Sequence, residues 1–139
     1  MDAASHTSTR APEPVGPYPH ARRAGPLLFL SGIGPRVRGS KEVPGVTLDA
    51  AGEVMSYDFE RQCRQVFENV RVVLEDAGSS WDRIVDVSAF LTDLKRDFAS
   101  FNRLYAEAFP PDNRPTRTTV EVSRLPTPIA IELKVIATI

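Results

Sequence analysis

Cysteine and histidine are scarce in this sequence of 139 residues, which contains one cysteine, Cys63, and two histidines, His6 and His20. A single cysteine cannot form a disulfide within the chain, and so few soft donors do not make a zinc site. We therefore expect no metal and a reducing compartment, which places the protein in the cytoplasm. Cys63 falls on an apolar helical stripe, which favours a packed core thiol over a nucleophile.

The sequence also lacks an excess of charge of one sign and a long apolar run. Seventeen basic and eighteen acidic residues leave a formal net charge of −1, which gives no electrostatic footprint for nucleic acid. The longest apolar runs, such as residues 27–30, are far shorter than the roughly 20 residues that span a bilayer. The N-terminus lacks the apolar stretch of a signal peptide. We expect neither a nucleic acid nor a membrane as partner.

The length fits one domain. Residues 1–15 contain serine, threonine, alanine and proline without apolar periodicity, which predicts a flexible tail before a domain over residues 16–139. Residues 32–55 are rich in glycine, proline and charge, and predict a long loop with one short strand near residues 46–48. Gly32 and Gly34 begin this loop, but no third glycine follows at the spacing of a phosphate-binding loop, so they indicate a turn.

Periodicity predicts two helices. Apolar residues recur at steps of three and four over residues 59–77 and 97–109. Asp58 or Ser56 can cap the start of the first helix, and Gly78 can end it.

The remaining segments predict strands. A first hairpin is predicted around Gly25 and Pro26, with strands over residues 18–24 and 27–31. A central strand buried on both faces is predicted over residues 84–92, because this segment is mostly apolar. A second hairpin is predicted from the alternation of apolar and polar residues over residues 116–123 and 129–138. This order predicts an α+β fold in which a mixed sheet carries both helices on one face. Because two helices leave the other face bare, we expect oligomerisation through that face.

Two charged residues fall in strand segments. Arg117 lies in a strand of threonines and valines, so its guanidinium must reach solvent or bind an anion. Glu132 lies between Ile131 and Leu133, where an acid can be a catalytic group with a shifted pKa, a salt-bridge partner or part of an exposed face. The pattern alone leaves these alternatives open.

Five blocks of sequence carry more specific information: residues 15–21, 30–32, 98–105, 114–122 and 131–137. In this order and at this spacing, they resemble the signature blocks of the reactive-intermediate deaminase (RidA, YjgF) family. The most specific is Arg-Pro-Thr-Arg-Thr-Thr-Val-Glu-Val at residues 114–122. The resemblance runs from about Gly16 to the C-terminus.

The resemblance implies a chorismate-mutase-like α+β fold, a homotrimer with active sites in the clefts between subunits, and hydrolysis of imines or enamines to ketones and ammonia without a cofactor. Carried over by motif position, Arg117 would hold the carboxylate of the substrate, and Glu132 would orient and deprotonate the attacking water. Three further positions would line the cleft: Tyr18, Ser31 and Asn102. The backbone of Thr119, where many members of the family have cysteine, would meet the imine nitrogen.

After the second strand the sequence differs from members that act on small imino acids. It has Ser-Gly-Ile-Gly-Pro-Arg at residues 31–36, followed by a longer basic loop, and is here similar to the 2-aminomuconate deaminases of aromatic degradation. Their substrate is a dicarboxylate, so a second cation is needed. We expect Arg36, Arg22 or His20 to bind the distal carboxylate, the alternative being that they are solvated loop charges.

The resulting prediction is an enzyme that converts 2-aminomuconate, through its imine tautomer, to 4-oxalocrotonate (the oxo form of 2-hydroxymuconate) and ammonia. A general 2-imino acid deaminase, acting on 2-iminobutanoate or 2-iminopropanoate, is the first alternative. A non-catalytic trimer that binds a small molecule or a protein is the second, because folds of one family can lose activity.

Overall fold

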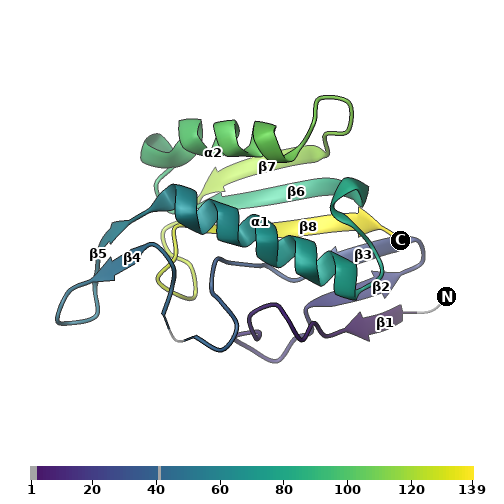
Figure 1. Ribbon diagram of the computed structural model, residues 1–139, viewed down its shortest axis with the longest axis horizontal. Coiled ribbons are helices and arrows are strands. Elements are labelled where there is room, and N and C mark those ends of the chain that lie inside the picture. Colours follow the sequence, from purple (N-terminus) through teal and green to yellow (C-terminus); the bar gives the residue numbers. More distant parts are fainter. Residues whose placement is uncertain (1–2, 41) are drawn as a thin grey trace.

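The computed structural model describes residues 3–40 and 42–139, which form an α+β fold around a mixed sheet (Figure 1). The sheet has six strands in the order β1-β2-β3-β8-β6-β7. Its strands are β1 (Ala3–His6), β2 (Ala21–Ala24), β3 (Leu27–Leu30), β6 (Ile84–Leu91), β7 (Thr116–Glu121) and β8 (Ile131–Thr138). Neighbouring strands are antiparallel except for β6 and β7, which are parallel. The predicted fold class is confirmed.

Two helices cover one face of the sheet, as predicted. Helix α1 (Phe59–Asp76) begins after Asp58, whose carboxylate accepts a hydrogen bond from the backbone of Arg61. Helix α2 (Leu94–Ala108) begins three residues before the predicted start, because Asp93 caps it in the same way through the backbone of Arg96. A short 3-10 helix, η1 (Trp81–Arg83), leads into β6.

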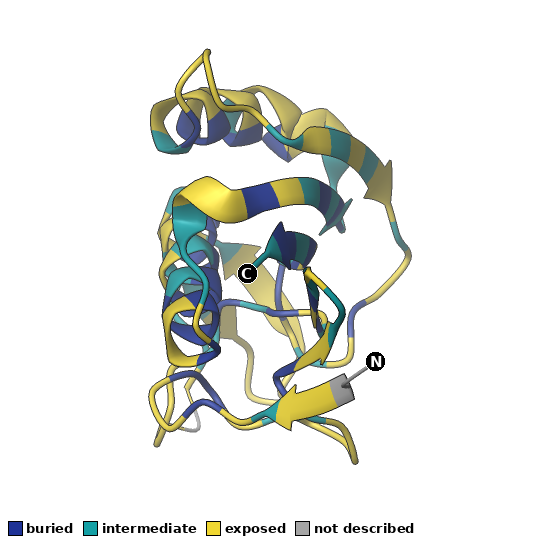
Figure 2. Ribbon diagram, turned by 90° about the vertical axis from the view of Figure 1, so that its right-hand side faces the viewer, coloured by how far each residue is buried: buried dark blue, intermediate teal, exposed yellow. Residues whose placement is uncertain are grey.

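The hydrophobic core lies between the helices and the sheet. Figure 2 shows the buried sides of both helices turned toward the strands. The core side chains of β8 alternate along the strand, and Ile131, Leu133 and Val135 are each at most 1% exposed. Strand β6 lies between β8 and β7, but only one of its faces is fully buried in this chain. Asp86, Ser88 and Phe90 on the other face are half-buried, so the prediction of burial on both faces is wrong for a single chain.

The predicted hairpin between β7 and β8 is wrong. Strand β8 lies between β3 and β6, while β7 pairs with the far side of β6 and forms the edge of the sheet. The cause is composition: every second residue of β8 is apolar and buried, which suits the middle of the sheet, whereas Thr118 and Val120 of β7 are exposed.

The predicted flexible tail is also wrong for residues 3–15. Strand β1 pairs with β2, and Ser8 and Ala11 are buried against the domain. The Ser8 hydroxyl donates to Asp76 at the end of α1 at 2.6 Å, and Arg10 forms an ion pair with the same carboxylate. A few specific polar contacts hold this segment, and apolar periodicity does not detect such contacts.

The predicted long loop contains a second, two-stranded sheet. Strand β4 (Val46–Leu48) confirms the one strand expected there, and β5 (Val54–Tyr57) pairs with it antiparallel. No sequence pattern predicted β5, because Val54, Met55 and Ser56 do not alternate in polarity, and all three are exposed.

Candidate active site

Arg117 lies on β7 with its side chain over α2. Its guanidinium carbon is 4.7 Å from the ring centre of Tyr105, 5.0 Å from that of Phe101 and 5.9 Å from that of Phe98. One guanidinium nitrogen donates a hydrogen bond to the side-chain oxygen of Asn102 at 2.7 Å. The rings and the amide hold the cation in a defined orientation. The other N–H groups have no protein acceptor in the described residues, so a planar pair of donors remains free for a carboxylate.

The helical repeat of α2 explains this environment. The side chains at positions 98, 101, 102 and 105 are three or four residues apart and therefore lie along one side of the helix. Phe101 and Tyr105 belong to the apolar repeat that predicted this helix, and they are buried. Phe98, 40% exposed, lies at the edge beside Arg117. Their role around a cation was not foreseen, although the spacing of aromatic residues in α2 was a signal for it.

Thr119 is two residues from Arg117 on the same face of β7. Its hydroxyl is buried and has no hydrogen-bond partner in the described part of the chain, and the same holds for the hydroxyl of Tyr105. Burial raises the pKa of Tyr105 to about 12, so this phenol stays protonated. The surroundings of Arg117 therefore include two buried hydroxyls whose hydrogen-bonding capacity the described residues do not use.

Glu132 lies on β8 with a half-buried side chain. Burial raises the pKa of the Glu132 carboxyl above the ordinary value. Among the described residues it forms neither an ion pair nor a side-chain hydrogen bond; Lys134, two residues along the strand, donates instead to the backbone of Leu30. A desolvated carboxylate without a counter-ion is well suited to accept a proton from water.

Gly32 makes room for this carboxylate. A Cβ atom at Gly32 would lie 2.7 Å from Oε2 of Glu132, closer than such contacts occur. Only glycine therefore allows the acid to lie against the backbone at the end of β3. The sequence analysis interpreted Gly32 as part of a turn and did not predict that it makes room for Glu132. Its position directly after Ser31, a predicted site residue, was a sign that it lies in the site.

Several predicted residues line a small pocket beside Gly32. Tyr18, Ser31 and Arg36 are among them, and the pocket volume is about 30 Å³, which is the space of one water molecule. The Ser31 hydroxyl donates to the backbone of Pro19 at 2.8 Å. Arg36 donates through one nitrogen to the backbone of Glu13 at 2.6 Å, and its remaining N–H groups are not used by the described residues.

The three candidates for binding the distal carboxylate have different environments in the structure. His20, 5% exposed, accepts at Nδ1 from the backbone of Ser8 and donates from Nε2 to the backbone of Pro12. Both ring nitrogens are bonded to the backbone, so His20 has no free donor for a carboxylate and the structure does not support its assignment. Arg22 is exposed on β2, two strands away from β8, and does not line the pocket. Arg36 and His20 both line the pocket beside Gly32, and of these two only Arg36 keeps N–H groups that the described residues do not use.

Arg117 and Glu132 do not meet within one chain. Arg117 is in register with Val87 and Glu132 with Phe90, two residues of β6 that are three apart and so point to opposite faces of the sheet. Arg117, Asn102 and Thr119 therefore form one group on the helix side, here called the arginine half-site. Glu132 and Gly32, with the pocket beside them, form a second group on the other side, here called the glutamate half-site.

Two further properties concern metal and membrane. In residues 3–40 and 42–139 no three acidic, histidine or cysteine side chains gather closely enough to hold a metal ion. No helix in this part of the chain is long and apolar enough to cross a membrane.

Known proteins resemble this chain over nearly its whole length. The family model described as Endoribonuclease L-PSP matches residues 8–139. A RutC family protein of Pyrococcus horikoshii is 41% identical over 128 residues, which cover 91% of this chain and 90% of that protein. The crystal structure of RidA from the Antarctic bacterium Psychrobacter sp. has a TM-score of 0.84 at 29% identity and covers 98% of this chain and 99% of that one. Escherichia coli TdcF with bound serine has a TM-score of 0.82 at 32% identity, with 98% of each chain covered.

Proposed function

The chain belongs to the Endoribonuclease L-PSP family, which includes RidA and the RutC proteins, and from this membership we propose that it is a cofactor-independent enamine or imine deaminase. Enamine and imine hydrolysis is the activity typical of the family. The observation that carries the proposal for this chain is the pair of half-sites: a preoriented arginine with free donors, and a desolvated carboxylate without a counter-ion.

We further propose that the active site forms between two copies of the chain. Arg117 and Glu132 point to opposite faces of one sheet, so a single chain cannot direct both to one substrate. The pocket of the glutamate half-site, at about 30 Å³, is too small for an imino acid. The outer face of the sheet, with Phe29 36% exposed and Phe90 half-buried, offers apolar area to a second copy. A homotrimer would complete each glutamate half-site with the arginine half-site of a neighbour.

The chemistry needs few groups. The C=N carbon of a 2-imino acid is already electrophilic, so the enzyme must fix the substrate, deliver water and release ammonia. The guanidinium of Arg117 would bind the carboxylate through two parallel hydrogen bonds. Glu132 would take a proton from water as its oxygen attacks the imine carbon and would pass this proton to the nitrogen. The C–N bond of the resulting carbinolamine then breaks as its hydroxyl gives up its proton to the departing ammonia and becomes the ketone. General base catalysis of this kind contributes roughly 10² to 10⁴ in rate.

The substrate we propose is 2-aminomuconate, which carries two carboxylates. Arg36 supports this choice because it lies in the pocket of the glutamate half-site with N–H groups to spare. TdcF binds serine, a small carboxylate, on the same fold. In this proposal Arg117 would bind the carboxylate next to the imine and Arg36 the distal one, and the product would be 4-oxalocrotonate.

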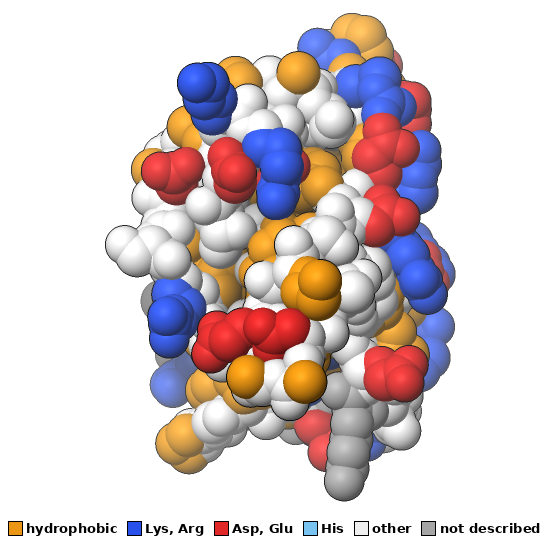
Figure 3. Space-filling view, turned by 90° about the vertical axis from the view of Figure 1, so that its left-hand side faces the viewer, with side chains coloured by type: hydrophobic (Ala, Val, Ile, Leu, Met, Phe, Trp, Pro, Cys, Tyr) orange, Lys and Arg blue, Asp and Glu red, His pale blue; other side chains and the backbone are white. Residues whose placement is uncertain are grey.

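An RNA substrate, which the family description names, fits this chain less well. The net charge is −1. On the face shown in Figure 3, basic and acidic side chains are interspersed and do not gather into a basic stripe. Tight binding of a polyanion depends on such a stripe.

The test compares ammonia release from 2-aminomuconate and from 2-iminobutanoate. We expect the first to be the better substrate, and Arg36→Gln to raise KM for it roughly tenfold while changing KM for 2-iminobutanoate less than about twofold. The matched control is Arg22→Gln, which we expect to leave both values unchanged. Faster turnover of 2-iminobutanoate, or equal effects of Arg36→Gln on both substrates, would contradict the proposed substrate. Activity on neither compound would contradict the deaminase itself.

A further inference from the structure

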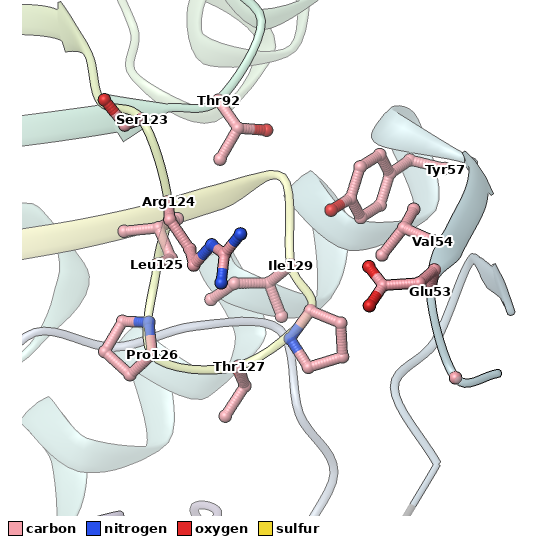
Figure 4. A pocket seen from close by; sticks show the side chains of 12 residues that line it. Glu53, Val54, Tyr57, Thr92, Ser123, Arg124, Leu125, Pro126, Thr127 and Ile129 are labelled. Carbon is pink, nitrogen blue, oxygen red and sulfur yellow. The ribbon is translucent and has the colours of Figure 1, made fainter.

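A second cleft, lined by none of the residues of the two half-sites, lies between the β4–β5 hairpin and the loop that joins β7 to β8 (Figure 4). Its volume is about 390 Å³, within the range of small-molecule sites. The walls come from the hairpin, from Thr92 after β6, and from residues 123–129. We propose that this cleft binds a free α-amino acid in its zwitterionic form.

Opposite charges on two walls carry the proposal. Arg124 extends into the cleft from the β7–β8 loop, and the carboxylate of Glu53 faces the same space from the hairpin (Figure 4). Within residues 3–40 and 42–139 neither side chain forms an ion pair or a side-chain hydrogen bond, so both charges are unpaired. A ligand with a carboxylate at one end and an ammonium group close by would pair with both.

Hydroxyl groups lie between the two charges. Figure 4 shows the hydroxyls of Tyr57 and Thr92 turned toward the space that Arg124 and Glu53 face. A hydroxyl can both donate and accept, so each can serve the carboxylate or the ammonium group of the ligand. Burial raises the pKa of Tyr57 above its ordinary value, so its hydroxyl keeps its proton.

The floor of the cleft is apolar. Leu125 and Ile129 are 9% and 3% exposed, and Val54 lies opposite them on the hairpin. This surface would accept the aliphatic side chain of the ligand and favours leucine or valine over a polar amino acid.

The cleft is formed without a ligand. On the loop side, the backbone N–H of Thr92 donates to the carbonyl of Ala130 at 3.2 Å, and the backbone N–H of Ile129 donates to the carbonyl of Thr127 at 2.7 Å. Pro126 and Pro128 restrict the backbone dihedral angles of this loop. On the hairpin side, the backbone of Glu53 donates to the Asp49 carboxylate at 2.9 Å. A preformed site loses little conformational entropy when a small ligand binds.

The test is a titration of the full-length protein with L-leucine, followed by NMR or calorimetry. Two probes each lack one charge: 4-methylpentanoate lacks the ammonium group and 3-methylbutylamine lacks the carboxylate. We expect L-leucine to bind at least about tenfold more tightly than either probe, since each charged hydrogen bond contributes about 1.5 kcal/mol or more, the equivalent of that factor.

Variants locate the binding site. We expect Arg124→Gln and Glu53→Gln each to weaken L-leucine binding roughly tenfold, and Arg83→Gln, which replaces an exposed arginine on η1, to leave it unchanged. Equal binding of 4-methylpentanoate and L-leucine would overturn the zwitterion assignment. Unchanged affinity in Arg124→Gln, or a loss of binding in Arg117→Lys alone, would place the ligand elsewhere and overturn the site. None of these outcomes bears on the deaminase activity, which depends on the two half-sites.

Discussion

Replacement of Arg117 by lysine keeps the positive charge but removes the planar pair of donors. The guanidinium lies over three aromatic rings and is oriented by Asn102, which leaves its other N–H groups free for a substrate carboxylate. A lysine ammonium group can still attract the carboxylate but cannot form two parallel hydrogen bonds to it.

The expected cost follows from the loss of one of these two bonds. A hydrogen bond between charged groups contributes about 1.5 to 3 kcal/mol, which corresponds to a decrease of roughly 10- to 150-fold in kcat/KM. Stability should change by less than about 1 kcal/mol, because lysine retains the cation beside the rings and the site is partly exposed.

Initial rates of ammonia release from the imine substrate measure this effect, and thermal unfolding checks the fold. The matched control is Arg103→Lys on α2, the helix that packs against Arg117, where the arginine pairs with Glu60 and Glu107 on the exposed side. We expect the control to be as active as the wild type. A kcat/KM within about twofold of wild type in Arg117→Lys would refute the assigned carboxylate contact.

Three other substitutions test separate parts of the account. Glu132→Gln should lower kcat roughly 10²-fold or more. Because burial raises the pKa of this acid, its contribution to stability is present at low pH and is lost as the pH rises through the raised value. The unfolding free energy of the variant relative to wild type should therefore increase as the pH rises from below the ordinary carboxyl pKa through the raised one, and a flat difference in chemical denaturation would contradict this. Gly32→Ala should displace the Glu132 carboxylate and lower activity at least about tenfold. The melting temperature should change little, because the flexible end of the Glu132 side chain can move away from the new methyl group, and an equally active variant would contradict the close contact. Ser8→Ala should lower the free energy of unfolding by about 1 to 3 kcal/mol, because the backbone donors of Arg10 and Ala11 lose their acceptor, and unchanged stability in urea would show that the N-terminal segment does not support the domain.

The helices could be predicted from the sequence because their periodicity is a local property. The apolar stripe and the cap of α1 were both apparent, and the start of α2 was displaced only because Asp93 was not taken as a cap. Strand partners are not local. Alternation in residues 116–123 and 129–138 predicts two strands but not that β6 lies between them.

The sequence singled out Arg117 and Glu132, and the resemblance implied a site between subunits, but neither specified the faces of the sheet on which the two residues lie. Arg117 and Glu132 stood out as charges in strand segments, and the family blocks gave them expected roles. Their placement on opposite faces depends on the registers of β7 and β8 with β6, which no pattern within either strand specifies. His20 was misassigned because its partners, the backbones of Ser8 and Pro12, belong to a segment predicted to be flexible.

Mixing two inactive variants tests the composite site most directly. Arg117→Ala and Glu132→Gln each remove one half-site, and neither homo-oligomer should have appreciable activity. If each site takes its arginine from one subunit and its glutamate from another, random co-assembly at equal amounts gives about one quarter of the sites both intact groups, so we expect about one quarter of wild-type activity. A co-assembled mixture no more active than the separate variants would contradict a site shared between copies of the chain.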